Sequence, residues 1–124
     1  MNIDELEATL PNGLHDALIC SYTFSEEERR VEVGIEVDMG DYRSRYVKAR
    51  LEFLDVSRWE PDAPHTVSMA PVAAGLRIDT CEEDPKAPLS VPAGGFAGRF
   101  FVSEWNAFIH FVASDVRLLW LEAN

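Results

Sequence analysis

His15 and Asp16 are the residues of this sequence that a search for catalysis meets first. A histidine beside a carboxylate can act as a proton-transfer dyad, or it can supply two ligands of a metal-dependent hydrolase. A metal site needs further ligands at a regular spacing, but the other two histidines, His65 and His110, lie far along the chain. A dyad needs both side chains on one side, whereas adjacent residues of a regular strand point to opposite faces. We therefore expect neither chemistry at this pair.

Asp16 interrupts an apolar strand pattern. Counted with the period of two that a strand imposes on residues 13–24, Asp16 shares a face with Leu14, Leu18, Cys20, Tyr22 and Phe24. A carboxylate on such a face needs donors, so we expect it to be buried or half-buried and bonded to the backbone of a neighbouring loop, with His15 pointing the other way. His15 and Asp16 are thus our candidate for a structural site, and a pocket in which Asp16 faces a ligand is the alternative.

The rest of the sequence offers no recognisable catalytic, cofactor or metal motif. Cys20 and Cys81 lie far apart, which predicts two buried or idle thiols and neither a disulfide nor a zinc site. The sequence has no Gly-x-Ser-x-Gly elbow, and its carboxylates are not spaced for acid and base roles. The glycine-rich stretch at 94–98 is not followed by the Lys-Ser/Thr of a phosphate-binding loop. We expect no catalytic residue, no cofactor and no metal, and enzymatic activity lacks support.

The composition predicts a single domain, residues 1–124, with an acidic surface. The content of 47% hydrophobic and 27% charged residues is ordinary for a globular protein of this length. A net charge of −11 repels nucleic acid and anionic lipid, so we expect neither as a partner. The acidity serves solubility or attracts a protein with a basic surface. We find no secretion signal and no run of 18 apolar residues, which favours a cytoplasmic location.

A short helix is expected near the N-terminus. Asn2 and Glu5 have the spacing of a capping box, and Met1 and Leu6 occupy the positions of a hydrophobic staple. Residues 11–13, Pro-Asn-Gly, end the helix. A helix of this length is marginal alone, so it should pack against the sheet.

Two segments alternate apolar and polar residues without exception. They cover residues 31–39 and 47–53 and predict an antiparallel pair with one solvated, charged face. If the loop between them is centred on Tyr42, Glu36 lies opposite Lys48; if it is centred one residue earlier, Glu32 lies opposite Arg50. Either register gives an exposed ion pair that contributes little stability.

Residues 55–98 contain six of the seven prolines, and their periodicity is weak. Two short or edge strands are expected there, around residues 65–69 and 76–81, the second with Leu76, Ile78 and Thr80 on one face. Residues 82–88 read as an exposed acidic loop, and residues 91–98 as a second, flexible loop.

The C-terminal part carries most of the apolar mass. Residues 99–122 read as a hairpin with breaks at 103–104 and 114–115, and its arms are apolar on both faces for part of their length. A helix over residues 103–113 is the competing interpretation, but the aromatic and β-branched content favours a strand. The tryptophans and phenylalanines should form the core more readily than they line a pocket. The predicted fold class is α+β, mainly antiparallel β, with a curved sheet of about six to seven strands and a short N-terminal helix.

Two segments resemble a loose group of small bacterial domains whose function is unknown. The first is Leu14-His15-Asp16-Ala17, which opens an antiparallel sheet in that group, and the second is the strand segment Leu51-Glu52-Phe53. Some members are immunity proteins of contact-dependent or polymorphic toxin systems. The resemblance implies an α+β fold with a curved antiparallel sheet, and it transfers no catalytic residue.

Three functions follow as hypotheses. The first is a non-enzymatic cytoplasmic protein-interaction domain, such as an immunity protein whose acidic face binds a basic toxin. The second is a small-ligand binding or enzymatic domain with a pocket near Asp16. The third is a homo-oligomer whose edge strands pair.

Overall fold

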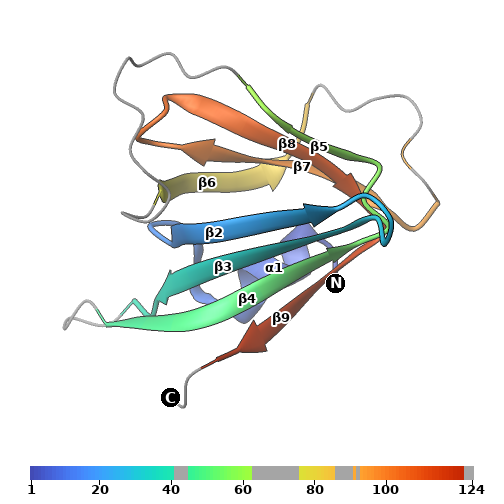
Figure 1. Ribbon diagram of the computed structural model, residues 1–124. Helices are drawn as coiled ribbons and strands as arrows, with labels where there is room; N and C mark the ends of the chain where they lie inside the picture. Colours follow the sequence, from blue (N-terminus) through green and yellow to red (C-terminus); the bar gives the residue numbers. More distant parts are fainter. Residues whose placement is uncertain (41–44, 63–75, 86–90, 92, 122–124) are drawn as a thin grey trace.

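The computed structural model describes residues 1–40, 45–62, 76–85, 91 and 93–121 (Figure 1). Within these residues one helix is followed by nine strands, and eight of the strands form a single sheet in the order β5-β8-β7-β6-β2-β3-β4-β9. All its neighbouring strands are antiparallel, which confirms the mainly antiparallel α+β class; the expected six to seven strands were too few. The sheet is open, with β5 and β9 at its two edges. The elements are α1 (Ile3–Thr9), β1 (Pro11–Leu14), β2 (Leu18–Ser25), β3 (Arg30–Asp38), β4 (Tyr46–Leu54), β5 (Arg58–Pro61), β6 (Leu76–Glu83), β7 (Phe96–Val102), β8 (Ala107–Ala113) and β9 (Asp115–Trp120).

The helix α1 has the predicted capping box. The Asn2 side chain accepts a hydrogen bond from the Glu5 N–H at 2.8 Å, and the Glu5 carboxylate accepts one from the Asn2 N–H at 3.1 Å. These bonds satisfy two backbone donors that a helix start leaves unpaired. Ile3 and Leu6 are buried, and α1 lies behind β2 to β4 in the view of Figure 1. The helix is thus held by packing against the sheet, as expected for its length. Within the described part of the chain, no helix is long and apolar enough to cross a membrane.

The predicted continuous strand over residues 13–24 is wrong, because the chain turns at His15 and Asp16. Asp16 has φ 64°, in the left-handed region that aspartate tolerates better than most residues. The turn separates β1 from β2, and the Asp16 N–H donates to the Ile78 carbonyl oxygen at 2.8 Å. A bulge near Cys20 then shifts the phase of β2: before it the fully buried Ile19 lies opposite Ile35, and after it Tyr22 lies opposite Val33.

Strands β3 and β4 form as predicted, with alternating buried residues. Glu36 lies opposite Lys48, so the register is the one centred on Tyr42. In this register Glu32 faces Glu52 across the two strands, and Arg30 pairs with both carboxylates. The expected solvated face is only partly solvated, because the Glu52 side chain is 6% exposed.

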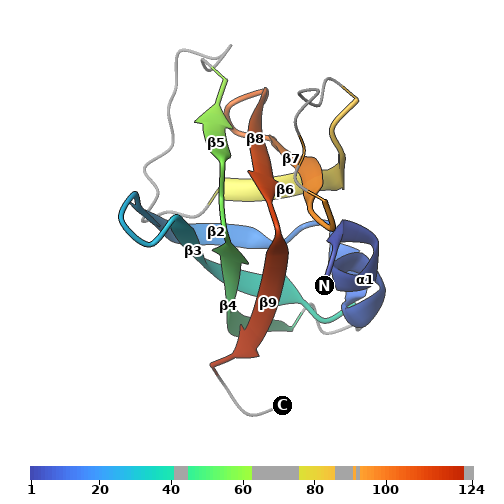
Figure 2. The same cartoon turned by 90° about the vertical axis from the view of Figure 1, so that its right-hand side faces the viewer.

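The sheet bends sharply where β4 continues into β5 and β8 continues into β9, giving the two layers visible in Figures 1 and 2. At the bend the Ser57 N–H donates to Val112 and the Ser114 N–H donates to Leu54, each at 2.9 Å. Strand β5 was not expected, because its sequence is charged and it ends in Pro61.

The strand interpretation of residues 103–113 is confirmed for β8. The hairpin is made by β7 and β8, joined at residues 103–106, whereas the second break does not form a hairpin turn. Instead Ser114 carries the chain into β9, which pairs with β4.

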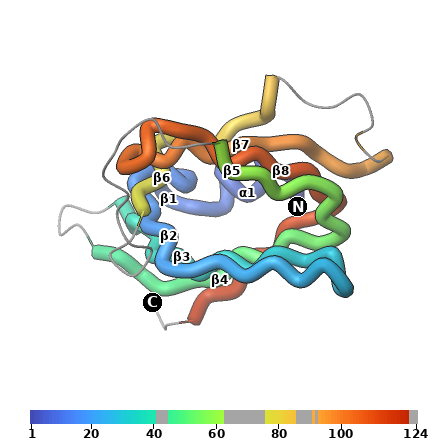
Figure 3. The backbone as a smooth tube through the Cα atoms, turned by 45° about the horizontal axis from the view of Figure 1, so that its top comes forward, coloured from blue at the N-terminus to red at the C-terminus, as the bar shows by residue number. Residues whose placement is uncertain are grey.

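The core fills the interior around which the backbone curves in Figure 3. Its centre is aromatic: the ring of Phe111 lies 4.9 Å from that of Phe53 and 4.8 Å from that of Phe100. Trp59 and Trp105 also pack on this core, whereas Trp120 is 37% exposed. The expectation that aromatic residues form the core therefore holds for most of them.

The proline-rich segment, residues 55–98, differs most from its predicted secondary structure and burial. Residues 76–81 do form a strand, β6, but a bulge after Ile78 turns Cys81 inward in place of Thr80. Asp84, expected in an exposed loop, is 5% exposed. Residues 96–98, expected in a flexible loop, begin β7. The strand expected around residues 65–69 lies outside the described residues.

Candidate functional site

The structure brings His15 and Asp16 together, contrary to the strand geometry that predicted opposite directions. The His15 Nε2 atom lies 3.5 Å from an Asp16 carboxylate oxygen, and Nδ1 lies 2.7 Å from the carbonyl oxygen of Asp79. In a turn, unlike in a strand, adjacent side chains can converge. Asp16 is half-buried as expected, but its side chain pairs with His15 and not with a loop backbone.

The His15 pair is open to solvent. The side chain of His15 is 52% exposed and that of Asp16 is 36% exposed. The carbonyl oxygen of Asp79 raises the pKa of His15 above 6.5, with desolvation opposing it and the charges of Asp16 and Asp79 adding to it. No serine, threonine or cysteine side chain in the described ranges hydrogen-bonds either residue. The contact with Asp79 thus ties the turn after β1 to β6.

A small apolar groove lies on the outer face of β2, β3 and β4, away from His15 and Asp16. Its volume is about 240 Å³, and its walls come from Cys20, Gly34, Ile35, Glu36, Lys48, Ala49 and Leu121. Burial raises the pKa of the Cys20 thiol, so the sulfur is a poor nucleophile at neutral pH. Neither residue of the sequence-predicted site lines this groove.

A second histidine forms a more buried polar cluster, on the outer face of β5, β8 and β7. His110 is only 7% exposed, and its Nδ1 atom lies 2.7 Å from a carboxylate oxygen of Asp84. Its Nε2 atom lies 3.0 Å from a carboxylate oxygen of Asp62. The Asp84 side chain is 1% exposed, whereas that of Asp62 is 46% exposed.

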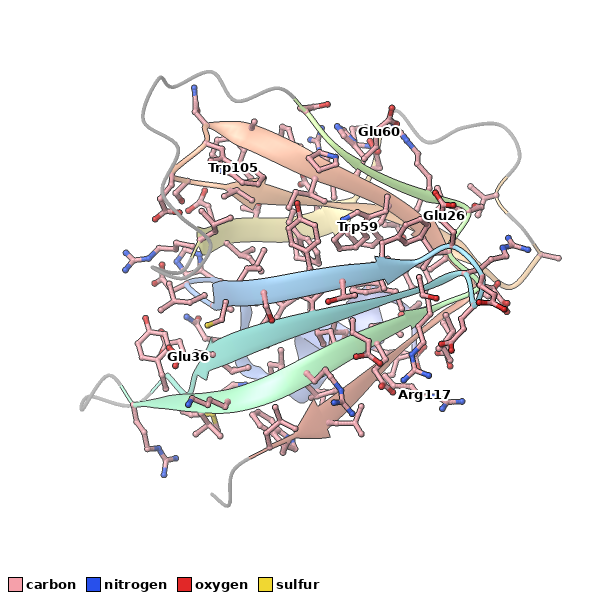
Figure 4. The ribbon with its side chains drawn as sticks, viewed as in Figure 1. Glu26, Glu36, Trp59, Glu60, Trp105 and Arg117 are labelled. Carbon is pink, nitrogen blue, oxygen red and sulfur yellow. The ribbon has the colours of Figure 1, made fainter. Side chains whose placement is uncertain are left out.

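Strand register places His110 at the middle of this cluster. Alternate residues of β8 face the core, so His110 and Phe108 point to the outside of the sheet. Directly across the strands, His110 lies opposite Glu60 on β5 and Arg99 on β7. Figure 4 shows the same division on β5, where Trp59 lies between the layers and Glu60 lies at the outer side.

Each exposed carboxylate on this face is bonded to a less exposed basic group. Glu60 accepts from Arg58 at 2.7 Å, and Glu82 is paired with Arg99 at 2.6 Å. The Arg99 guanidinium also lies 3.9 Å from the centre of the Phe108 ring. We call this surface the His110 face; it consists of Arg58, Glu60, Asp62, Glu82, Asp84, Arg99, Phe108 and His110.

The hydrogen-bond donors and acceptors of His110 and its two aspartate partners limit the roles that this cluster can have. Ionised carboxylates only accept, so His110 bonds both aspartates fully only when both ring nitrogens carry a proton. No hydroxyl or thiol among the described side chains bonds His110, and no group of three or more potential ligands there is arranged to hold a metal ion. Within the described residues, the cluster is a hydrogen-bonded arrangement of charged and polar side chains centred on His110.

The sequence patterns did not predict the His110 face. His110 does carry a signal, since it is an ionisable residue at an outward position of an apolar strand. Its two partners carried none, because Asp62 and Asp84 come from the proline-rich middle, where no periodicity predicted their positions.

Comparison of this chain with models of protein families, with curated proteins and with solved structures gives no match.

Proposed function

We propose that this chain is a non-enzymatic protein-interaction domain that binds a basic surface of a partner protein through the His110 face. The observation that carries the proposal is that Glu60, Asp62 and Glu82 are exposed yet held in place. Their side chains are 64%, 46% and 46% exposed, and each is bonded to a cation or imidazole that is at most 30% exposed.

Fixed carboxylates favour binding for two reasons. Side chains that are already ordered lose less conformational entropy when a partner binds. The net charge of −11 also attracts a basic partner at long range and speeds association. The basic groups of the His110 face are bonded to carboxylates of the same face. The charge that this face presents to a partner is therefore negative.

We further propose that the partner is a toxin and that the chain acts in the cytoplasm as its immunity protein. The acidity of the chain and the resemblance of its Leu14 to Ala17 and Leu51 to Phe53 segments to domains that include immunity proteins support this choice. A toxin that acts on nucleic acid carries the basic surface that an acidic face would cover.

The test uses the products of the genes next to the one encoding this chain. Each is co-expressed with the chain, and a complex is measured by calorimetry over a series of NaCl concentrations. We expect a tight complex that weakens with salt. Replacing Glu60→Gln, Asp62→Asn and Glu82→Gln together should weaken it at least tenfold, about 1.4 kcal/mol.

The matched control removes the same amount of charge elsewhere. Glu26, Glu27 and Glu28 form the exposed turn between β2 and β3, and their replacement by Gln should change affinity much less. Equal weakening by both triple variants would show that only net charge matters. No complex with any neighbouring product, together with a metabolite that stabilises the chain, would favour the small-ligand alternative instead.

A further inference from the structure

Strand β9 is the last strand of the sheet, and among the described residues the part of its outer edge beyond Val116 has no backbone partner. Leu121 donates its N–H to the Lys48 carbonyl oxygen, so alternate residues of β9, counting back from Leu121, bond β4. The residues between them therefore direct their N–H and C=O groups away from β4; these residues are Val116, Leu118 and Trp120. Val116 confirms this, because both of its backbone groups bond the backbone of Met1.

Leu118 and Trp120 are left on this edge. Among the described residues, no backbone group lies within bonding distance of their outward N–H and C=O groups. The surrounding surface is apolar: Leu119 is 36%, Trp120 37% and Leu121 56% exposed. Natural edge strands are usually protected by charged residues, proline or a bulge, and residues 118–121, which follow Arg117, contain none of them.

We propose that β9 pairs with β9 of a second copy of this chain, antiparallel and about a two-fold axis at Leu119. In this register Leu118 of each copy lies opposite Trp120 of the other, and the two residues exchange both hydrogen bonds. Four backbone bonds form, which satisfy all the free groups of Leu118 and Trp120 on both copies. The edge is thus complementary to itself, as a two-fold interface requires.

The side chains fit the same arrangement. Leu119 meets Leu119 of the second copy on the outer face at the axis, where cross-strand side chains are closest. Leu121 covers the aliphatic part of Arg117 of the other copy. In this register Leu121 of the second copy lies opposite Arg117, one residue before Val116, whose outward backbone groups bond Met1.

The β4 residues opposite residues 118–120 are basic or apolar, and the acidic turn between β2 and β3 lies away from them. The free half of β9 lies at the end of the sheet away from the β2–β3 turn that carries Glu26 (Figures 1 and 4). With strands about 4.8 Å apart, the two copies of β4 would be about 14 Å from one another. That separation exceeds the Debye length of about 8 Å at physiological salt. The pairing uses a surface separate from the His110 face, so it stands independently of the proposed function.

The full chain is examined by size-exclusion chromatography with light scattering over a concentration series. We expect a species of twice 13.9 kDa that dissociates on dilution. Leu119→Lys places two ammonium groups at the axis and should give the monomer at every concentration. The control Phe24→Lys changes an apolar residue of similar exposure, 44%, on β2 and should leave the dimer intact.

A second variant tests the register and does not depend on weakening the fold. In a Cys20→Ser background, Leu119→Cys should form an intermolecular disulfide when diamide accepts the two electrons, because closely paired Cα atoms about 4.5 Å apart suit a disulfide. Leu121→Cys should not, since its opposite residue is Arg117. A wild-type chain that is monomeric at all soluble concentrations, or cross-linking at 121 but not at 119, would overturn the proposal.

Discussion

The Nδ1 atom of His110 lies 2.7 Å from a carboxylate oxygen of Asp84, and both side chains are buried on the outer side of the sheet. The bond joins the end of β6 to the middle of β8 across β7. The Asp84 N–H donates to the Ala97 carbonyl oxygen at 3.1 Å, and the β7 residue directly opposite His110 is Arg99. The pair thus fixes the chain at the point where β6 ends.

Asp84→Ala should lower the free energy of unfolding by about 3–5 kcal/mol. The change leaves the His110 Nδ1 atom without its buried hydrogen-bond partner, and it leaves Arg58, 3.7 Å from Asp84, without that buried carboxylate. Asp62→Ala removes the other partner of His110, but that carboxylate is 46% exposed, so the loss should be below about 1 kcal/mol. Urea denaturation of the two variants measures the difference. Equal losses would mean that burial of Asp84 does not matter.

Glu52→Ala should destabilise the protein by about 3 kcal/mol, because it leaves Arg30 and Arg50 together on one face without the carboxylate between them. Glu32→Ala is the matched control, since Glu32 also pairs with Arg30 but its side chain is 43% exposed. Thermal unfolding should show a clear shift for the first variant and little for the second. The reverse order would contradict the importance of the buried carboxylate.

Gly98→Ala should destabilise the core by about 1–3 kcal/mol. A Cβ at this position would lie 2.6 Å from the Phe111 ring and 3.2 Å from Ile3, and neither can move freely. At Gly34 the nearest atom is the hydroxyl of Ser21, 2.7 Å away, which can rotate, so Gly34→Ala should cost less. Denaturant midpoints of the two variants test this ranking, and a costlier Gly34→Ala would reverse it.

His15 should make stability fall as the pH rises through neutrality. Its folded-state pKa is raised above 6.5, chiefly by the Asp79 carbonyl oxygen, so its stabilisation is complete below pH 6.5 and is lost as the pH passes the folded-state pKa. His15→Gln should remove this component. The unfolding free energies of the wild type and of His15→Gln should be compared between about pH 6 and 9. This range starts near the pKa of histidine in the unfolded chain, about 6.5. Parallel curves would show that His15 does not contribute.

Structural features that depend on residues close in sequence, or paired across one hairpin, were predicted correctly. The capping box of Asn2 and Glu5 and the alternation of β3 and β4 depend on contacts within a few residues or across one hairpin, and both form as expected. The pairing of Glu36 with Lys48 was one of two registers that the pattern allowed, and it required the structure to choose between them.

The turn at Asp16 shows why the strand period of two did not predict the directions of the side chains that follow it. A single left-handed residue resets the phase of every following side chain, and a bulge near Cys20 resets it again. A pattern of apolar residues cannot reveal either change when both faces of the segment are partly apolar.

The sequence by itself determined an acidic, mainly antiparallel domain with a capped N-terminal helix and an aromatic core, because composition and local periodicity encode these properties directly. Only the tertiary structure decided that His15 meets Asp16, that His110 lies between Asp62 and Asp84, and that β9 is left at an edge. These relationships join segments that are distant in sequence or separated by turns and bulges. Their positions follow from how the sheet bends and pairs, which no local pattern records.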